Sequence, residues 1–442
     1  MRKKDKYLGL NKSEFLYLAV DDLVPSVPQL ITMRFDTEHN PSEIKSAFLN
    51  ILNLYPRLRA IVEPTLFSYR LKIISDQYHI DSLFEDAFRV ETGLKFDSTK
   101  YKDFRKNLLN EPFKLQYSLP IKIRFLPEEN ILFISIHHIP CDGVGWVHMA
   151  SSLAKVLNEN EVTPITVDDP SMVPGIFKSP YITAPRQLFD SWRLHSADKK
   201  ENSKDKIINP ASKKIDFFGG AGMHQHYLKQ NLSELKPKAK EIGCSLNVYF
   251  LTAIARAFFN LYDDSKGDTV AIRLSYDLRP YFEKEKPLFG NYVTTSILRA
   301  HRQDMDKPDV MMKKIQDQLS EALDRLNNKK LSYPWFIDKI FTFLGKKLYS
   351  QAILLAKKKS ISQPTVHFST VGSLDFLNKA GEKAKIKDVI ATVPTFGLFM
   401  TLINIDGVFN INISYPSAEY QDEAIKSLID KFEEEVDSLL TI

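Results

Sequence analysis

The clearest hydrophobic pattern along the chain is a short apolar run at residues 131–136, which leads directly into polar residues. A run of this length bounded by a turn signal predicts a buried strand. Pro140 has no backbone N–H, so the strand must end before it. Because successive side chains of a strand point to opposite faces, His137 and His138 cannot both face one cavity. The segment after the run reads His137-His138-Ile139-Pro140-Cys141-Asp142-Gly143.

Apolar residues spaced three and four apart predict several amphipathic helices. One of them starts at Gly143 and buries Trp146 and Met149. The turn with the two histidines therefore precedes a helix N-terminus, where exposed amides favour negative charge. Further along, Gly243 is expected to end one helix and Ser245 to cap the next. The pattern places helices at residues 41–54, 143–157, 232–242, 246–261 and 418–440, and strands at 57–62, 131–136 and 270–277.

Two other segments bear on the organisation of the chain. Residues 186–215 are rich in charge and poor in apolar side chains. They predict a crossover linker between an N-terminal half at 1–185 and a C-terminal half at 216–442. Residues 334–359 carry an apolar stripe at helical spacing, with lysines elsewhere. We expect this helix to pack on the core, and the alternative is a helix that contacts a membrane surface or covers an acyl-binding tunnel.

Composition and charge exclude some classes of function. The 442 residues include 60 Lys and Arg against 55 Asp and Glu, a net charge of +5 that does not indicate nucleic-acid binding. Two cysteines far apart in sequence favour a reducing compartment over a disulfide scaffold. The first residues are basic but lack the apolar region of a secretory signal, and no uncharged apolar stretch approaches the ~18 residues that span a bilayer. We therefore expect a cytoplasmic protein without a transmembrane segment.

The string His-His-x-x-x-Asp-Gly at residues 137–143 resembles the signature of the chloramphenicol acetyltransferase-like superfamily. This superfamily includes plant BAHD acyltransferases, alcohol O-acyltransferases, wax ester synthases and the condensation domains of nonribosomal peptide synthetases. The resemblance implies an α/β fold of the α+β sandwich type. In such a fold two similar halves form a V with a tunnel between them, and we expect the chain to be a monomer.

The resemblance also implies a role for the second histidine. His138 would be the general base, which takes the proton from an acceptor hydroxyl or amine as it attacks a thioester carbonyl. An imidazole with an ordinary pKa near 6.5 suits that task. For a lone histidine, an ordinary packed side chain at the end of a strand would be the better interpretation. His137, which points the other way, is expected to be structural.

Asp142 admits two interpretations. Its position near His138 suggests a relay that orients the histidine, as in a Ser-His-Asp triad. The resemblance implies instead that Asp142 turns away from His138 and pairs with an arginine of the second half, for which Arg279 in Tyr-Asp-Leu-Arg-Pro is the match. Such a pair would brace the turn. Gly143 would allow close backbone approach.

Two more segments resemble the family. Residues 288–292 read Leu-Phe-Gly-Asn-Tyr and match its FGN motif, so Gly290 and Asn291 are expected to line the tunnel. Ser369 and Thr370 lie in a segment similar to an SN-x-G strand end, and their hydroxyls are expected to face the acyl oxyanion. Residues 395–397 are at best a remnant of the DFGWG motif, which argues against a plant-type enzyme.

Other reactive residue types carry less weight. A thiol nucleophile at Cys141 is disfavoured, since direct transfer needs no covalent enzyme intermediate. His224 and His226 have no carboxylate or cysteine at ligand spacing, so no metal is expected. No redox cofactor is required either. Acyl-CoA or a phosphopantetheinyl carrier would enter as substrate.

These features predict an acyltransferase that moves an acyl group from acyl-CoA or an acyl carrier protein to a hydroxyl acceptor. One alternative is a freestanding condensation-type enzyme that forms an amide between carrier-bound substrates. A second is a catalytically silent binding module, against which the intact His138, Asp142 and Gly143 argue. The acyl chain and the acceptor depend on the shape of the tunnel.

Overall fold

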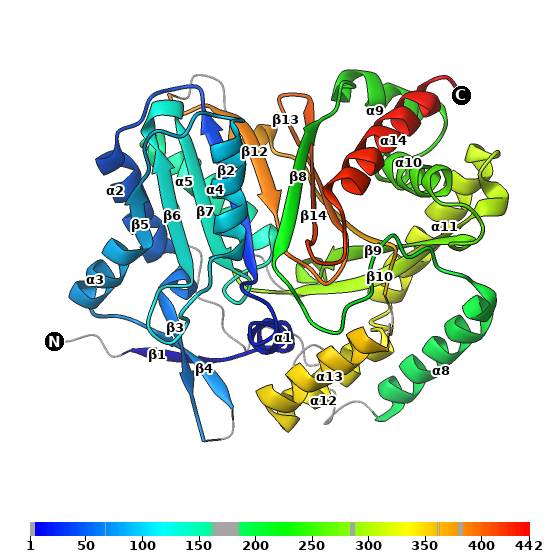
Figure 1. The fold of residues 1–442 in the computed structure, drawn as a ribbon. Helices are drawn as coiled ribbons and strands as arrows, with labels where there is room; N and C mark the ends of the chain where they lie inside the picture. Colours follow the sequence, from blue (N-terminus) through cyan, green and yellow to red (C-terminus); the bar gives the residue numbers. More distant parts are fainter. Residues whose placement is uncertain are drawn as a thin grey trace.

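The computed structural model describes residues 5–66, 68–160, 162, 185–282, 288–359, 361, 363–378 and 383–442, and arranges them in two α/β halves (Figure 1). A five-stranded sheet forms the centre of the N-terminal half, in the order β12-β2-β7-β6-β5. Three helices cover one face of this sheet and a fourth covers the other. The strands are β12 (Ile386–Thr392), β2 (Pro28–Phe35), β7 (Ile131–His137), β6 (Ile121–Leu126) and β5 (Phe88–Val90), and the helices are α2 (Pro41–Leu54), α3 (Gln77–Ala87), α5 (Gly143–Leu157) and, on the other face, α4 (Thr99–Asn110).

A six-stranded sheet with the order β10-β9-β11-β13-β14-β8 forms the C-terminal half. Four helices pack on one face of this sheet and build the largest apolar core with it. The other face turns toward the N-terminal half, where the Thr401 hydroxyl donates to the Ala391 carbonyl at 2.7 Å. The elements are β10 (Val293–His301), β9 (Thr269–Asp277), β11 (Val366–Ser373), β13 (Phe399–Ile405), β14 (Val408–Pro416), β8 (Ala221–Tyr227), α9 (Leu232–Glu241), α10 (Leu246–Leu261), α11 (Pro308–Asn327) and α14 (Asp422–Leu440).

Smaller elements close one edge of the molecule, at the bottom of Figure 1. A three-stranded sheet has the order β1-β4-β3. Helix α1 packs beside α12 and α13, where the Ser350 hydroxyl donates to the Ala19 carbonyl at 2.8 Å. These elements are β1 (Lys6–Gly9), β3 (Ala60–Pro64), β4 (Tyr69–Ile73), α1 (Lys12–Val20), α8 (Pro185–Glu201), α12 (Tyr333–Leu344) and α13 (Lys346–Lys358).

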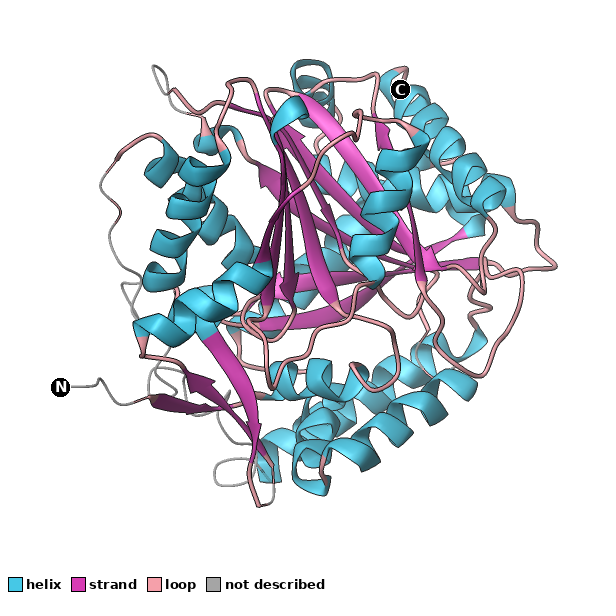
Figure 2. Ribbon diagram, turned by 60° about the vertical axis from the view of Figure 1, so that its left-hand side comes forward, coloured by secondary structure: helices cyan, strands magenta, loops and turns pink. Residues whose placement is uncertain are grey.

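The fold class expected from the sequence is confirmed, with two halves that each place helices on a sheet (Figure 2). One strand crosses from the C-terminal part of the sequence into the N-terminal sheet, since β12 pairs with β2. A boundary drawn along the sequence therefore does not separate the two sheets. The segment at 186–215 was expected to be a linker, but most of its first half belongs to α8, a helix of 17 residues at Pro185–Glu201.

Most of the predicted elements are confirmed, including the buried strand β7 and the Ser245 cap of α10. Three details are wrong. The strand predicted at 57–62 starts only at Ala60, since Pro56–Arg59 form a 3-10 turn. The last helix starts at Asp422 rather than at 418. The helix predicted at 334–359 is two helices, because Gly345 at φ 89° ends α12 and starts α13.

The packing of α12 and α13 matches the expectation of a core-facing stripe only in part. Trp335 and Phe336 are buried, and the rings of Phe341 and Tyr349 stack at 5.3 Å. Leu344 and Leu348 are instead exposed. Contact of this surface with a membrane stays a prediction. Within the described ranges, no single helix has the length and apolar composition of a membrane span. The helices α9 and α10 reach that length and composition only when they are taken together, and they are bent by 93° relative to each other.

Candidate active site

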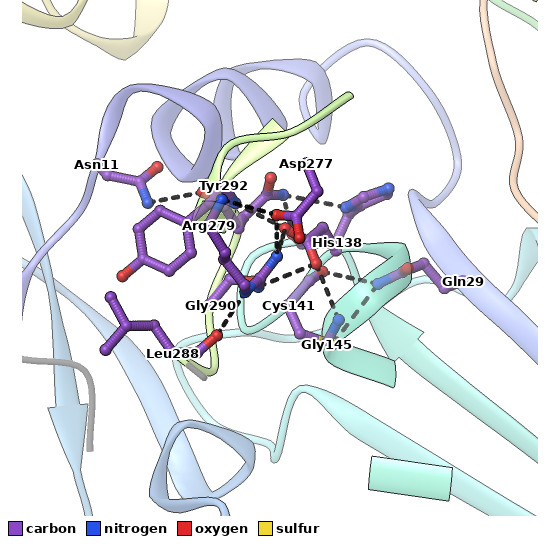
Figure 3. A network of polar contacts seen from close by, with 12 residues as sticks. Asn11, Gln29, His138, Cys141, Gly145, Asp277, Arg279, Leu288, Gly290 and Tyr292 are labelled. Atoms are coloured by element: carbon purple, nitrogen blue, oxygen red, sulfur yellow. Dashed lines mark hydrogen bonds and ion pairs between the residues drawn. The ribbon is translucent and has the colours of Figure 1, made fainter. Parts of the chain in front are cut away.

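His137 is the last residue of β7, and His138 follows it in the turn that leads to α5 (Figure 3 shows His138). The β7 strand is fully buried through His137, and the chain then turns at residues 138–140. Asp142 caps α5, since its carboxylate accepts a hydrogen bond from the Gly145 amide at 2.9 Å. Cap and strand end together fix the direction in which the turn presents its side chains.

His138 is held by residues of both halves. Its ring is stacked on that of Tyr17 from α1, with the centroids 3.9 Å apart and the planes inclined by 4°. From the C-terminal half, the Asn291 side-chain amide donates to the His138 carbonyl at 2.9 Å and lies 3.1 Å from Nδ1. The backbone carbonyls of His138 and Cys141 also interact with the ring. Within the described part of the chain, Nδ1 contacts the Asn291 amide and no side chain forms a hydrogen bond with Nε2.

Burial makes His138 a neutral imidazole at neutral pH. Its side chain is 8% exposed, and burial lowers its pKa to about 4, although the Asp142 charge and backbone carbonyls partly oppose the shift. A neutral ring can accept a proton from a substrate, so its state at pH 7 is the one that a general base requires.

Helix α1 is anchored so that Tyr17 stays over His138. Glu14 of this helix and Arg57, both almost fully buried, form an ion pair. At the start of the helix, the Asn11 side-chain amide donates to the Asn291 carbonyl at 3.0 Å. Since Asn291 also bonds His138, the position of α1 and the position of the histidine depend on the same residue.

His137 has the structural environment expected of it. Its Nδ1 accepts from the Ile139 amide at 3.2 Å, so the ring proton sits on Nε2, which lies 3.3 Å from an Asp21 oxygen. The ring packs edge-on against Phe113. The two rings have different surroundings, but β7 ends at His137 and His138 already lies in the turn, so the separation does not depend on alternation within the strand.

Asp142 does not form a relay with His138. It is fully buried and accepts four hydrogen bonds: two from Arg279, one from the Gly145 amide and one from the Tyr292 amide at 2.7 Å. These bonds use the acceptor positions of the carboxylate, so none is left for the histidine. The structure brings Asp142 and Arg279 together across the two halves, as the resemblance implied.

All five N–H groups of Arg279 have acceptors. Nη1 bonds Asp142 at 3.0 Å and Asp277 at 2.9 Å, and Nη2 bonds Asp142 at 3.1 Å and the Gly290 carbonyl at 2.8 Å. Nε donates to the Leu288 carbonyl at 2.6 Å. The Asp142 amide also donates to the Gly290 carbonyl at 3.1 Å. The guanidinium therefore ties the histidine turn to β9 and to the segment that carries Asn291.

The glycines of the site differ in how strictly they are required. At Gly143 a Cβ would meet nothing closer than 4.0 Å, so the protein itself leaves room for a side chain there. A Cβ on Gly145 would lie 2.6 Å from the Cys141 Cβ, and one on Gly290 would lie 2.7 Å from the Tyr292 ring. Sequence reasoning singled out Gly143 and Gly290, whereas close packing requires glycine at Gly145 and Gly290.

The two residues predicted to face the acyl oxyanion, Ser369 and Thr370, have different surroundings. Ser369 shares the sheet face that turns toward the N-terminal half, since Phe368 beside it packs into the C-terminal core. The Thr370 hydroxyl instead accepts from the Gly372 amide at 3.1 Å, at a bulge in β11. The Gly145 amide at the start of α5 donates its hydrogen bond to the Asp142 carboxylate.

Cys141 has the environment of a structural cysteine. It is fully buried, and burial, assisted by the Asp142 charge, raises its pKa. Its carbonyl accepts from the Gln29 side chain at 2.7 Å. A thiol in this state is a poor nucleophile. Among the described residues, no group of three or more His, Cys, Asp or Glu side chains could hold a metal ion.

Sequence reasoning missed several residues of the site. Tyr17 and Asn11 lie more than 120 residues before His138, and no motif marks them. His367 and Ser275 hydrogen-bond each other at 2.8 Å in the second half. Alternation on β9 and β11 was the signal that could have found the last two, because each of them alternates with a core residue.

Comparison with known proteins identifies the fold. No family model matches the chain, and no curated protein sequence matches it. The first condensation domain of the calcium-dependent antibiotic synthetase, solved with a substrate analogue, is 10% identical, with a TM-score of 0.71 over 98% of this chain and 97% of that one. TRI3 trichothecene 15-O-acetyltransferase from Fusarium sporotrichioides is 13% identical, with a TM-score of 0.70 over 98% and 96%.

A third solved structure is a mutant of the starter condensation domain of rhizomide synthetase RzmA, in complex with C8-CoA and Leu-SNAC. It is 14% identical, with a TM-score of 0.67 over 99% of this chain and 95% of that one. At these identities the comparison establishes the fold alone. The chain has the chloramphenicol acetyltransferase-like condensation fold, and the resemblance seen in the sequence is confirmed at that level.

His138, which is buried, and His367, which is partly buried, make the stability of the protein sensitive to acid. Burial lowers the pKa of His138 to about 4 and that of His367 to about 3. Below pH ~6.5 the unfolded chain takes up protons that the folded chain refuses until about pH 4. The free energy of unfolding should therefore fall as the pH falls from ~6.5 to ~4, by at most ~1.4 kcal/mol per unit for each histidine.

Urea unfolding of wild type and His138→Gln at several pH values between 7 and 4.5 measures this effect. The variant should lose stability less steeply. His79→Gln, at an exposed position, is the matched control and should follow the wild type. Identical slopes for wild type and His138→Gln would contradict the prediction.

Proposed function

We propose that the protein transfers an acyl group from a thioester donor to a hydroxyl acceptor, with His138 as the general base. The observation that carries the proposal is the neutral His138 ring, held between Tyr17 and Asn291 with Nε2 left over. In the reaction, the acceptor oxygen attacks the thioester carbonyl, and Nε2 takes the hydroxyl proton. A C–O bond forms, the C–S bond breaks, and the proton passes to the leaving thiolate.

The Asp142–Arg279 pair supports this reaction by shape rather than by contact with the substrate. It fixes the turn at residues 138–142 against the segment that carries Asn291. A base must stay within hydrogen-bond reach of the proton that it abstracts. The pair and the Tyr17 stack keep His138 in one position during that step.

The donor is proposed to be an acyl-CoA or an acyl carrier protein. Support for a thioester comes from the RzmA neighbour, which was solved with C8-CoA and Leu-SNAC. Support for a hydroxyl acceptor comes from the trichothecene O-acetyltransferase. Amide formation between carrier-bound substrates, as a condensation domain would perform, is the alternative outcome of the test below.

The test is incubation of the protein with a panel of acyl-CoAs and acyl carrier proteins, with hydroxyl and amine acceptors. Release of free thiol and the mass of the product are measured. Esters formed by wild type but not by His138→Ala support the proposal. Amide products would assign condensation instead, and no thiol release above background with any pair would leave only a binding module.

Cys141→Ser should retain substantial transfer activity, because direct attack needs no enzyme thiol and burial raises the pKa of the Cys141 thiol. Thiol release by the variant, within about tenfold of wild type, is the expected result. Mass spectrometry of quenched wild-type enzyme should find no acylated Cys141 peptide. An acyl-Cys141 species that forms and decays at the turnover rate would show a thiol mechanism.

A further inference from the structure

Leucine side chains are exposed at the edge of the molecule formed by the β3–β4 turn and the α12–α13 corner, at the bottom of Figure 1. Leu66 in the turn is 86% exposed. Leu344 ends α12, and Leu348 and Leu355 lie two helical turns apart on α13, each about half exposed. We refer to these four side chains as the leucine edge. Exposed apolar side chains that gather in one region mark surfaces that bind proteins or membranes.

Aromatic contacts hold the turn and the corner side by side. The Phe15 ring from α1 contacts Tyr69 at the start of β4 and Tyr349 of α13, with centroid distances of 6.5 and 6.3 Å. The Nζ of Lys346 lies 5.8 Å from the centroid of the Tyr69 ring. Leu66 is only three residues before Tyr69, so the turn and the start of α13 present their leucines in one region.

Helix α13 carries unpaired positive charge on the side that exposes its leucines. Residues 346–359 contain five lysines and no Asp or Glu. Two of these lysines form ion pairs, one with Asp22 and one with Glu419. The other three are exposed and form no ion pair within the described part of the chain: Lys347, Lys358 and Lys359. The exposed side of the helix therefore combines apolar contact area with free positive charge.

The lysines and leucines of α13 are neighbours on the helix surface. Lys358 and Lys359 follow Leu355 by three and four residues, a spacing at which side chains of a helix meet. Lysines beside exposed apolar residues are typical of helices at a membrane surface, because the lysines reach the lipid phosphates while the apolar side chains enter the headgroup boundary. A second copy of the chain in a two-fold dimer would instead bring the same lysines against each other. Charge therefore favours an anionic lipid surface as the partner.

We propose that the leucine edge and the three unpaired lysines bind the surface of a membrane that contains anionic lipids. The leucines enter the boundary between the headgroups and the acyl chains, and the ammonium groups of Lys347, Lys358 and Lys359 contact lipid phosphates. The protein lies on the membrane in this arrangement and does not cross it. The inference goes beyond the proposed function and does not depend on it, because none of these side chains belongs to the candidate active site.

Sedimentation of the full chain with lipid vesicles tests the proposal. Wild type should bind vesicles of phosphatidylcholine with about one quarter phosphatidylserine, and should bind vesicles of phosphatidylcholine alone about tenfold more weakly. A rise in salt from about 0.1 M to about 0.5 M should weaken binding to the anionic vesicles, because salt screens the lysine charges. The double variant Lys358→Glu/Lys359→Glu and the single variant Leu348→Glu should each lower the apparent affinity for the anionic vesicles by about tenfold.

Matched controls make the same changes elsewhere on the surface. Lys236→Glu/Lys240→Glu alters the same number of charges at exposed positions of α9, which lies at the opposite, upper edge of Figure 1. Leu323→Glu replaces an exposed leucine of α11. Both control proteins should bind the anionic vesicles within about twofold of wild type. All of these side chains are exposed, so the variants should fold, and their melting temperatures verify this.

Three outcomes would overturn the inference: no binding of wild type to the anionic vesicles, equal binding to both lipid mixtures, or equal binding by Leu348→Glu and wild type. Light scattering without vesicles tests the other occupant of the surface. A wild-type dimer that Leu348→Glu converts to a monomer would assign the leucine edge to self-association instead. Vesicle binding is measured without a thioester or an acceptor, so its result is independent of whether the protein transfers acyl groups.

Discussion

Replacing His138 by alanine is expected to lower acyl transfer by about 10²- to 10⁴-fold, the usual cost of losing a general base. The variant should keep its fold. The Asn291 side chain bonds the backbone carbonyl at position 138, and that bond survives the truncation. Tyr17 belongs to a helix that is anchored separately through Glu14. Thiol release and the melting temperature measure the two effects independently.

His137→Ala is the matched control, because it deletes the same side chain one position earlier on the same strand. The His137 ring accepts a hydrogen bond from the Ile139 amide and faces Asp21. Removal of the ring therefore leaves the buried Ile139 amide without that hydrogen-bond partner. We expect a lower melting temperature with activity reduced far less than in His138→Ala. If His138→Ala released thiol at the wild-type rate, the assignment of His138 as the general base would be wrong.

The sequence predicted those features of the fold that depend on neighbouring residues. The strand β7, the helix α5 and the cap at Ser245 follow from local periodicity and from single cap residues. The prediction of a strand at 57–62 was wrong at its start, because Pro56 favours the first turn of a helix as much as the start of an extended segment. Gly345 was a visible helix breaker inside the 334–359 stripe, so its positive φ could have been expected.

Features that depend on distant residues stayed out of reach. The pairing of β12 with β2 joins segments about 350 residues apart, and no local pattern marks which half a strand completes. The Tyr17 stack on His138 could not be predicted either, because α1 has no strong apolar stripe and the two residues lie more than 120 positions apart in the sequence. The Asp142–Arg279 contact was predicted from the family resemblance. From spacing alone, Asp142 would have been interpreted as the relay partner of His138.

The choice between brace and relay has a mechanistic consequence. A relay aspartate would accept from the ring of His138, whereas the carboxylate of Asp142 is filled by Arg279, Gly145 and Tyr292. Asp142 still acts on His138 through its charge, which raises the pKa of the histidine against the effect of burial. In the proposed mechanism, Asp142 would therefore act through its charge and by holding the turn in place, without proton transfer.

Arg279→Ala should destabilise the protein strongly, by about 3–5 kcal/mol, because it leaves the buried Asp142 charge without its partner. Asp142→Asn should also destabilise the protein, although Arg279 keeps its ion pair with Asp277 in that variant. Asp142→Asn also turns an amide N–H₂ toward groups that are themselves donors. The double variant should cost less than the sum of the single variants, with a coupling energy between about 0.5 and 3 kcal/mol. Urea unfolding of the four proteins gives the cycle, and strictly additive effects would show that the two residues are not energetic partners.

Arg279→Lys tests whether charge alone suffices. A lysine offers three N–H donors from a single point, whereas Arg279 distributes five donors over Asp142, Asp277 and two backbone carbonyls. We therefore expect Arg279→Lys to recover little of the stability lost in Arg279→Ala. Arg325→Ala, which breaks the partly exposed pair with Asp198, is the control and should cost no more than about 1 kcal/mol. If Arg279→Lys were as stable as wild type, the brace would be a simple charge pair, and the carbonyls of Leu288 and Gly290 would not depend on the guanidinium.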